Sequence, residues 1–245
     1  MSSMQPPSMT EHQVTLRDLG LIKYQEAWDL QESLLQSVIT KKLNSASDFS
    51  TPETENYLLL CQHPHVFTLG KSGSEENLLA NFIQLQAKNA EFVKTNRGGD
   101  ITYHGPGQIV GYPILNLDYF VKGIREYVDK LEETIILTLE DYGIKAERMN
   151  GATGVWIDTE VPGKTRKICA IGVRVSRGVS MHGFAFNVNT DLAYFRMINP
   201  CGFTDKAVTS LSKELGRVID EDEVKARYVK HFGIVFNASL DTRLH

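Results

Sequence analysis

The clearest pattern in the chain is a periodic run of apolar residues between residues 124 and 142. Successive members lie four, three, four, four and three residues apart: Ile124, Val128, Leu131, Ile135, Leu139 and Tyr142. Steps of three and four residues place side chains on one face of an α-helix. Gly143 follows immediately, and glycine is a common C-terminal stop. The pattern therefore predicts an amphipathic helix that ends near Gly143.

Short apolar runs before and after this helix predict strands. Tyr57–Cys61 and Val66–Leu69 are continuous apolar runs, which is typical of buried strands. Ile109–Leu117 is a further strand in which Pro113 indicates an edge position or a break. Three more strands are predicted after the helix, the last two joined by a turn at Arg177-Gly178: 154–158, 167–175 and 181–188.

Two further helices flank these strands. Three- and four-residue spacing of apolar residues predicts a helix within Ile22–Leu43, followed by a polar loop over Asn44–Thr54. Asp220 and Glu223 resemble a capping box, which predicts a last helix closed by Gly233. Strands in the middle of the chain, with helices between and after them, favour an α+β fold over a regular βαβ array.

Composition and termini limit the classes of protein that remain. Residues 1–13 are polar and contain two prolines, so we expect a loose N-terminus, whereas no linker interrupts residues 14–240, which we expect to form one domain. Lys+Arg 26 against Asp+Glu 30 gives a charge of −4, which argues against a nucleic-acid or anionic-membrane partner. No apolar run approaches the ~18 residues that cross a membrane. Three widely spaced cysteines suit a reducing cytoplasm.

A glycine-rich run, 97–108, reads Arg-Gly-Gly-Asp-Ile-Thr-Tyr-His-Gly-Pro-Gly-Gln. Its glycines allow positive φ and close approach of the backbone to a ligand. The run does not match the phosphate-binding P-loop pattern. It is compatible with a tight turn between two strands, but Arg97, His104 and Gln108 beside the glycines favour a ligand-binding loop.

A metal site is a weaker interpretation of Cys61, His63 and His65, which would share one face of a strand. Pro64 disrupts such a strand, and a zinc site needs three or four matched ligands. We therefore expect no metal and interpret this segment as a polar loop near a pocket.

The three cysteines differ in local context. Cys61 follows three leucines and suits the core, and Cys169 lies in a strand pattern that allows either core or pocket wall. Cys201 lies in an irregular Asn-Pro-Cys-Gly segment, where reactive residues are often presented. Local context therefore favours Cys201 as a nucleophile while leaving an incidental role open.

Four segments together resemble the lipoyl(octanoyl) transferase family: Arg97–Gln108, Lys167–Gly172, His182–Asn187 and Asn199–Gly202. They occur in the family's order, and the resemblance extends from about Tyr24 to Phe236. It implies a mixed β-sheet flanked by helices, similar to the catalytic domain of biotin and lipoate protein ligases.

The resemblance implies an enzyme that moves an octanoyl or lipoyl group from acyl carrier protein to a lysine of a lipoyl-domain protein. The implied acceptors are the lipoyl domains of 2-oxoacid dehydrogenases and the glycine cleavage H protein, and no cofactor is implied. Cys201 would carry the acyl thioester, with Lys167 as its partner. The implied substrate-binding residues are Arg97, Gly98, Gly99, Asp100, Ile101, Thr102, Tyr103, His104, Ala170, Ile171, Gly172, Gly183, Phe184 and Ala185.

The implied chemistry needs an activated thiol, because a free cysteine with a pKa near 8.5 is only a few per cent thiolate at neutral pH. We expect Lys167 to take the proton of Cys201 or to pair with its thiolate, although the sequence around Lys167 also fits a solvated strand edge. Backbone N–H groups within residues 170–172 are expected to stabilise the oxyanion. A basic cluster is interpreted either as a steering surface for acidic carriers or as a solvated hairpin face: Lys164, Arg166, Lys167, Arg174 and Arg177.

Three rival functions fit parts of this pattern. An ATP-dependent lipoate or biotin ligase would activate a free acid and would not depend on Cys201. A non-catalytic binder would hold the acyl carrier without turnover. A thioesterase would form the same acyl-enzyme but release the acyl group to water.

Overall fold

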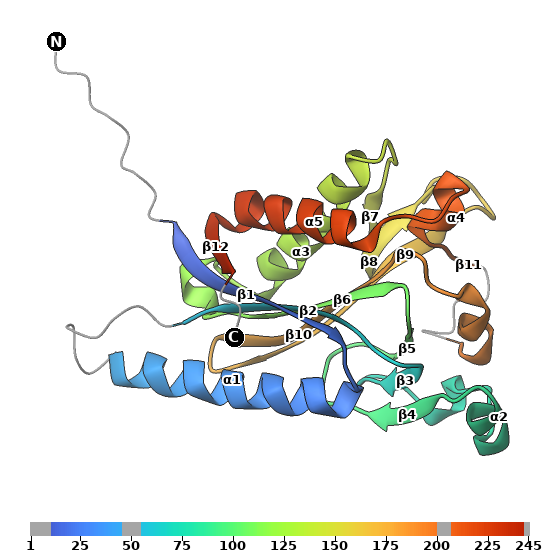
Figure 1. Ribbon diagram of the computed structural model, residues 1–245, viewed down its shortest axis with the longest axis horizontal. Helices are drawn as coiled ribbons and strands as arrows, with labels where there is room; N and C mark the ends of the chain where they lie inside the picture. Colours follow the sequence, from blue (N-terminus) through green and yellow to red (C-terminus); the bar gives the residue numbers. More distant parts are fainter. Residues whose placement is uncertain (1–10, 46–54, 200–206, 243–245) are drawn as a thin grey trace, which may run out of the picture.

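The structure, a computed structural model, describes residues 11–45, 55–199 and 207–242 (Figure 1). Within these residues a mixed sheet of nine strands carries the fold, with β11 attached to β9 and the other strands in the order β12-β1-β2-β6-β10-β9-β8-β7. Its strands are β1 (His12–Leu21), β2 (Tyr57–Gln62), β6 (Gln108–Ile114), β7 (Glu147–Met149), β8 (Ala152–Ile157), β9 (Arg166–Ser176), β10 (Val179–Asn187), β11 (Ala207–Val208) and β12 (Ala238–Thr242). A smaller sheet in the order β4-β3-β5 comprises β3 (Val66–Leu69), β4 (Glu91–Lys94) and β5 (Ile101–His104).

Helices cover both faces of the large sheet. Figure 1 shows α3 and α5 on one face and the long α1 on the other, which confirms the predicted α+β arrangement of a mixed sheet flanked by helices. The helices are α1 (Tyr24–Ser45), α2 (Phe82–Ala87), α3 (Ile124–Glu140), α4 (Leu211–Leu215) and α5 (Glu221–Phe236), with short 3-10 helices η1 (Glu75–Asn77), η2 (Leu117–Tyr119) and η3 (Leu192–Met197). None of the helices in the described part of the chain is long and apolar enough to cross a membrane.

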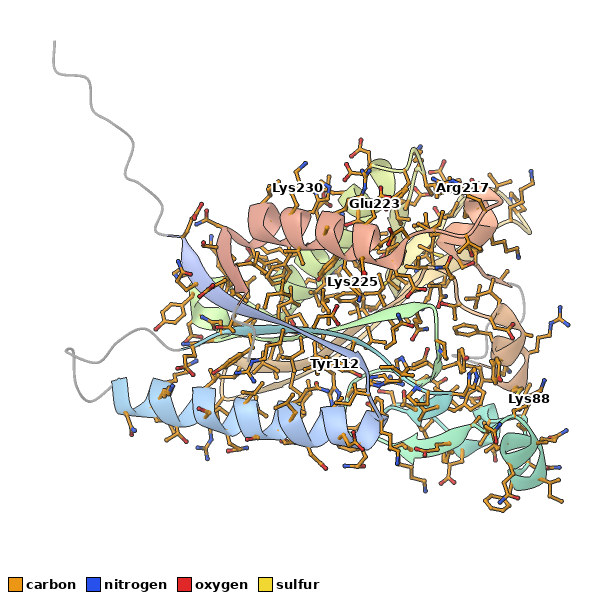
Figure 2. All side chains as sticks on the ribbon, in the orientation of Figure 1. Lys88, Tyr112, Arg217, Glu223, Lys225 and Lys230 are labelled. Atoms are coloured by element: carbon orange, nitrogen blue, oxygen red, sulfur yellow. The ribbon has the colours of Figure 1, made fainter. Side chains whose placement is uncertain are left out.

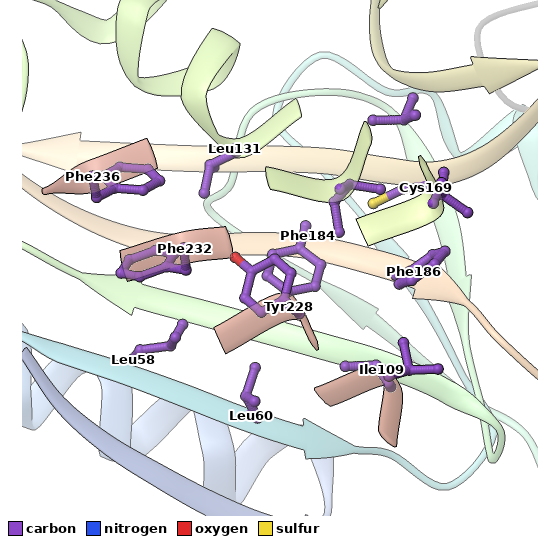
Figure 3. Close-up of a cluster of buried hydrophobic side chains, with 14 of the residues drawn as sticks. Leu58, Leu60, Ile109, Leu131, Cys169, Phe184, Phe186, Tyr228, Phe232 and Phe236 are labelled. Carbon is purple, nitrogen blue, oxygen red and sulfur yellow. The ribbon is translucent and has the colours of Figure 1, made fainter. Parts of the chain in front are cut away.

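Two apolar layers hold these helices on the sheet. On the side of α3 and α5, Phe184 of β10 packs against Tyr228 of α5, with ring centroids 4.6 Å apart, within a large buried cluster (Figure 3). On the opposite side, Tyr112 of β6 belongs to the cluster between the sheet and α1 (Figure 2). Burial of both faces explains why the strand β2 is apolar along almost its whole length.

The periodic helix is confirmed as α3. It ends at Glu140, and Gly143 takes the left-handed conformation with φ +72°. The hairpin turn is also confirmed, because Arg177 and Gly178 both have positive φ (52° and 78°), which suits a tight turn between β9 and β10.

The prediction that Gly233 closes the last helix is wrong. Helix α5 continues to Phe236 and is closed by Asn237 at φ 51°. Gly233 instead allows close packing, because a Cβ there would lie 3.0 Å from the carbonyl oxygen of Ala238. The absence of a Cβ lets β12 return close against the helix.

Pro113 marks a break and not an edge. Its strand, β6, lies between β2 and β10, and Pro113 pairs with Leu58 of β2. On the other side the ladder with β10 extends only to Gly111. The carbonyl oxygen of Pro113 accepts a hydrogen bond from the Ser180 hydroxyl at 2.8 Å. Because proline has no N–H, the central strand exchanges backbone pairing for a side-chain contact at this point.

The structure also refines the segment boundaries. Strand β1 begins at His12, so the last two residues of the predicted loose N-terminus, His12 and Gln13, are paired in parallel with β12. The predicted loop over Asn44–Thr54 lies mostly outside the described residues, since α1 is described to Ser45.

Candidate active site

A cavity of about 720 Å³ lies where the glycine-rich run meets β9 and β10. Strands β9 and β10 form part of its wall, and residues of η3 form another part. Lys167 lines it, as do most of the predicted substrate-binding residues: Arg97, Gly99, Asp100, Ile101, Thr102, His104, Ala170, Ile171, Gly172, Gly183, Phe184 and Ala185. Segments far apart in the sequence therefore converge on one space.

Among the predicted substrate-binding residues, Gly98 and Tyr103 do not line this cavity. The N–H of Gly98 donates to the carbonyl oxygen of Val173 at 2.9 Å, which fastens the run to β9. Tyr103 is fully buried, and its ring stacks on Tyr194 of η3 with centroids 4.8 Å apart. Both residues therefore contact elements that form the cavity wall, β9 and η3, without lining the cavity themselves.

Lys167 lies near the start of β9, where three strands meet. It pairs with Trp156 of β8 on one side and with Val208 of β11 on the other. Its Nζ donates to the carbonyl oxygen of Thr153 at 3.0 Å and lies 4.5 Å from the centre of the Trp156 ring. The ammonium is thus held by a carbonyl dipole and a cation–π contact at the cavity wall.

Cys201 lies outside the described residues. The described residues on either side of that segment, Asn199 and Ala207, both line the cavity. Directly after the segment, Val208 pairs with Lys167, and the N–H of Thr209 donates to the carbonyl oxygen of Lys167 at 2.9 Å. The described chain therefore resumes at Ala207 and Val208 alongside the start of β9.

Arg97 begins a chain of hydrogen bonds through the site. One amino group of its guanidinium donates to both the carbonyl oxygen and the hydroxyl of Thr68, at 2.7 and 2.9 Å. The Thr68 hydroxyl lies 3.2 Å from Nε2 of His104, and Nδ1 of His104 lies 2.8 Å from the amide oxygen of Gln108. Since that oxygen can only accept, Nδ1 carries the proton and Nε2 accepts from Thr68.

The series of hydrogen bonds continues from Gln108 to Thr209, whose N–H donates to the carbonyl oxygen of Lys167. The Gln108 amide nitrogen donates to Asn187 at 2.9 Å, and the Asn187 amide nitrogen donates to the carbonyl oxygen of Thr209 at 3.0 Å. One continuous buried network therefore links the glycine-rich run to the residue that bonds the backbone of Lys167. Such a network fixes the relative position of its members.

Burial keeps the histidines of this region neutral. It lowers the pKa of His182 to about 3 and that of His63 to about 4. Burial, with His63 nearby, also places the pKa of His104 well below the usual value. Neutral imidazoles can act as both donor and acceptor, as the contacts of His104 require.

The two histidines that were considered as metal ligands, His63 and His65, have hydrogen-bonding partners within the protein. His63 lies 2.7 Å from the Ile22 carbonyl oxygen and 2.7 Å from the Tyr112 hydroxyl, which occupies both ring nitrogens. His65 faces Tyr103 instead, with Nδ1 2.7 Å from its hydroxyl. Within the described residues, no cluster of three or more metal-ligating side chains occurs.

Three members of the basic cluster have different surroundings. Arg166 makes a two-pronged pair with Glu214, with both N···O distances 2.7 Å. Arg174 pairs with Glu32 of α1 at 2.7 Å. Arg166 and Arg174 are therefore paired with carboxylates, whereas Lys167 lines the cavity.

Several residues of the site were not singled out from the sequence. Thr68 and Trp156 carry no local signal, because their contacts depend on strand pairing. His182 and Asn187 lie within a segment that the resemblance did identify, but without a role. The sequence signal that could have identified Asn187 is the presence of a polar residue in a buried strand. Its exposed fraction in the structure is 3%.

Comparisons with known proteins agree with this geometry. The model of the lipoyl protein ligase A/B catalytic domain matches residues 23–233. The octanoyltransferase of Christiangramia forsetii is 55% identical over 229 residues, 93% of this chain and 97% of that protein. The octanoyltransferase of Cytophaga hutchinsonii is 52% identical over 241 residues, 96% of this chain and 98% of that protein.

The fold matches a solved structure as well. The bipartite lipoate protein ligase of Thermoplasma acidophilum superposes with a TM-score of 0.66 at 14% identity, over 96% of this chain and 86% of that chain. At this identity the likeness shows the fold alone, and it confirms the ligase-like catalytic fold predicted from the sequence. The chain therefore belongs to the lipoyl protein ligase A/B catalytic-domain family and, within it, to the octanoyltransferases.

Proposed function

We propose that this protein transfers an octanoyl group from acyl carrier protein to a lysine of a lipoyl-domain protein, through a thioester on Cys201. The relatives named octanoyltransferase support the acyl group and the reaction class. The observation that carries the proposal is the pairing of Val208 with Lys167, because the first described residues after the segment of Cys201 lie beside a lysine in the cavity wall.

In the first half-reaction the Cys201 thiolate attacks the carbonyl carbon of the octanoyl carrier. A new C–S bond forms to Cys201, the C–S bond to the carrier breaks, and the carrier thiolate leaves. Lys167 holds the proton taken from Cys201 and returns it to the leaving thiolate. One thioester replaces another, so this step is nearly isoenergetic and needs no separate activation of the acid.

In the second half-reaction the acceptor lysine attacks the Cys201 thioester as a neutral amine. The C–N bond of the amide forms, the C–S bond breaks, and the proton of the amine passes to the Lys167–Cys201 pair. An amide is more stable than a thioester, so this step runs downhill. Two half-reactions through one acyl-enzyme predict ping-pong kinetics.

The cavity wall suits an apolar acyl chain. Apolar side chains from five elements line it, among them Ile101, Trp156, Ile171, Phe184 and Phe195. Burial of an acyl chain against such side chains is favourable by roughly 0.8 kcal/mol for each methylene. We therefore assign the apolar part of the cavity to the octanoyl chain.

Ile171 is the best-placed donor for the oxyanion within residues 170–172. The carbonyl oxygen of Val173 accepts from Gly98, so the backbone polar groups of Val173 point away from β10. Ala170 and Gly172 lie one residue out of phase with Val173 and direct theirs toward β10, in register with Ala185 and Gly183. The N–H of Ile171 therefore points away from the β10 ladder, at a residue that lines the cavity.

The test is intact-mass analysis after mixing the protein with octanoyl-acyl carrier protein in the absence of ATP. Wild type and Cys169→Ser are expected to gain one octanoyl group, and Cys201→Ser to gain none. Later addition of a lipoyl domain should move the group to that domain, whereas a thioesterase would release octanoate. If no variant is acylated until ATP and free octanoate are supplied, the protein is a ligase and the proposal fails.

A further inference from the structure

Glu132 is a buried acid that the proposed reaction does not use. It lies on α3 between the core residues Leu131 and Ile135, and only 5% of it is exposed. A buried carboxylate is costly unless it is paired and hydrogen-bonded, and a buried ion pair often adds little net stability. The question is therefore what this carboxylate holds in place.

The two oxygens of Glu132 have different partners. Oε1 accepts a hydrogen bond from the backbone N–H of Gly154 at 2.8 Å, and Oε2 lies 3.2 Å from Nε of Arg148. Burial raises the pKa of the carboxyl, while the Gly154 N–H and Arg148 act against that rise. The side chain of Glu132 on α3 therefore holds the backbone N–H of Gly154, near the start of β8.

Gly154 is held in a conformation and a space that only glycine can occupy. Its φ is +120°, and a Cβ there would lie 2.5 Å from the carbonyl oxygen of Cys169. The same Cβ would lie 3.3 Å from Cε and 3.5 Å from Cδ of Lys167. The methylenes of Lys167 therefore run across the bare Cα of the residue that Glu132 holds.

The residues around Gly154 form a cradle for Lys167. Thr153 accepts the Nζ hydrogen bond at 3.0 Å, and the Trp156 ring lies under Nζ at 4.5 Å. The indole N–H of Trp156 donates back to the carbonyl oxygen of Ala152 at 2.9 Å, which closes the segment on itself. The register between β8 and β9 shifts between Val155 and Trp156, and such bulges redirect side chains.

We propose that Glu132 is a positioning residue for Lys167, acting through the N–H of Gly154 to hold the 152–156 cradle against the lysine side chain. The inference rests on the proposed function, in which Lys167 exchanges a proton with Cys201. Glu132 does not line the cavity, and its described partners are Gly154 and Arg148. Its effect on the reaction is therefore indirect.

Positioning and direct electrostatics make different predictions for Glu132→Gln. The amide oxygen of glutamine can still accept from Gly154, but the negative charge is lost. If Glu132 acts by holding Gly154, Glu132→Gln behaves like wild type and Glu132→Ala does not. If its charge acts on Lys167 through space, both variants lose activity equally.

Trp156 offers a readout that does not depend on catalysis. The chain has two tryptophans, so Trp28→Phe leaves Trp156 as the single indole. In that background Lys167→Ala removes the ammonium from the ring and changes the emission spectrum. Glu132→Ala is expected to change the emission in the same direction, and Glu132→Gln to leave it unchanged.

Glu133→Ala is the matched control. Glu133 is the next residue on α3 and binds Nη2 of the same Arg148 at 2.7 Å. It has no bond to Gly154 in the described contacts and is not buried. Its removal should alter neither the Trp156 emission nor the transfer rate.

The reaction itself supplies the second readout, the single-turnover rate of Cys201 acylation as a function of pH. Misplacement of a catalytic group by about 1 Å can cost about 100-fold in rate, so Glu132→Ala is expected to slow acylation by about 10- to 100-fold. Its pH profile should move to higher pH, because the displaced lysine no longer assists thiolate formation. Loss of properly folded protein alone would lower the rate equally at every pH.

Gly154→Ala provides an independent variant if Glu132→Ala does not fold. It should reproduce the emission change and the shifted pH profile without touching the carboxylate. The inference is overturned if Glu132→Ala or Gly154→Ala keeps the wild-type emission and pH profile, or if Glu132→Gln is as impaired as Glu132→Ala. If the emission changes as expected but Lys167→Ala still acylates at the wild-type rate, the positioning stands and the proposed role of Lys167 fails.

Discussion

Gly172 of β9 lies directly opposite Gly183 of β10 in the antiparallel ladder. A Cβ on Gly172 would lie 2.9 Å from the carbonyl oxygen of Gly98, and one on Gly183 would lie 2.1 Å from that of Gly111. The glycine-rich run approaches the sheet at this point, where Gly98 bonds Val173. Gly172 therefore allows the loop to lie directly on β9, Gly183 allows the close approach of β6, and both residues line the cavity.

The first prediction concerns Gly172→Ala. The added methyl group would push the carbonyl oxygen of Gly98 and the Arg97 side chain, which lies 3.2 Å from the Cβ position, out of place. Displacement of the run should lower the transfer rate by about 10- to 100-fold, and overpacking should cost about 1–3 kcal/mol of stability. Steady-state transfer to a lipoyl domain and urea unfolding measure the two effects.

Gly123→Ala is the control for this substitution. Gly123 has extended backbone at φ −179°, and no heavy atom lies within 4 Å of a Cβ there. It should retain wild-type activity and stability. Equal activity of Gly172→Ala and Gly123→Ala would show that the close approach of the run to β9 is not required.

The second prediction concerns Arg97→Lys. The guanidinium bonds the carbonyl oxygen and hydroxyl of Thr68 with one amino group and the carbonyl oxygen of Gly98 with the other. A lysine keeps the charge but cannot span both sites, because its three donors share one nitrogen. We expect a loss of about 1–3 kcal/mol in stability and at least a tenfold loss in kcat/KM. Wild-type behaviour of Arg97→Lys would mean that only the charge matters.

The sequence predicted the elements well because their patterns are local. The helix over 124–142 and the turn at Arg177-Gly178 depend on neighbours within a few residues. The end of α5 was misjudged because Gly233 serves a contact with Ala238 that only the folded chain creates. For Pro113 the sequence predicts either a break or an edge position, and the choice between them depends on which strands pair with β6 in the folded chain.

The candidate site also contains both residues that the local sequence indicates and residues whose role arises only from the folded structure. The run that begins at Arg97 is recognisable from its own glycines and polar residues. By contrast, the importance of Asn187 arises from partners on two distant segments, Gln108 and Thr209. The cradle around Lys167 depends likewise on a register shift between strands, which no local pattern records.

The third prediction concerns the reactivity of Cys61 and Cys169. Both are fully buried, and burial raises the pKa of each thiol. Because the thiolate is the reactive form, neither should react with iodoacetamide in the folded protein near neutral pH. Mass analysis of Cys201→Ser is expected to show no alkylation before unfolding and two alkyl groups after it. Rapid labelling of the folded variant would show that one of these thiols reaches solvent.

The fourth prediction concerns the pH dependence of stability. The folded-state pKa is about 4 for His63 and about 3 for His182, and that of His104 is also well below the usual value. In the unfolded chain each histidine titrates near 6.5. Below that pH the unfolded state binds protons that the folded state excludes. The contribution to stability is therefore complete above about pH 6.5 and is lost as the pH falls toward the folded-state values.

Each of these histidines should remove about 1.4 kcal/mol of unfolding free energy for each pH unit between about pH 6 and pH 5. Carboxyl groups with lowered pKa, such as those of Asp141 and Glu214, add their own loss only at lower pH, because unfolded carboxyls titrate near 4. Urea unfolding across this window measures the slope. His63→Asn should reduce the slope by the share of one histidine, even though the loss of its bond to Tyr112 lowers stability at every pH. A flat profile across this window would show that these imidazoles are already protonated in the folded protein.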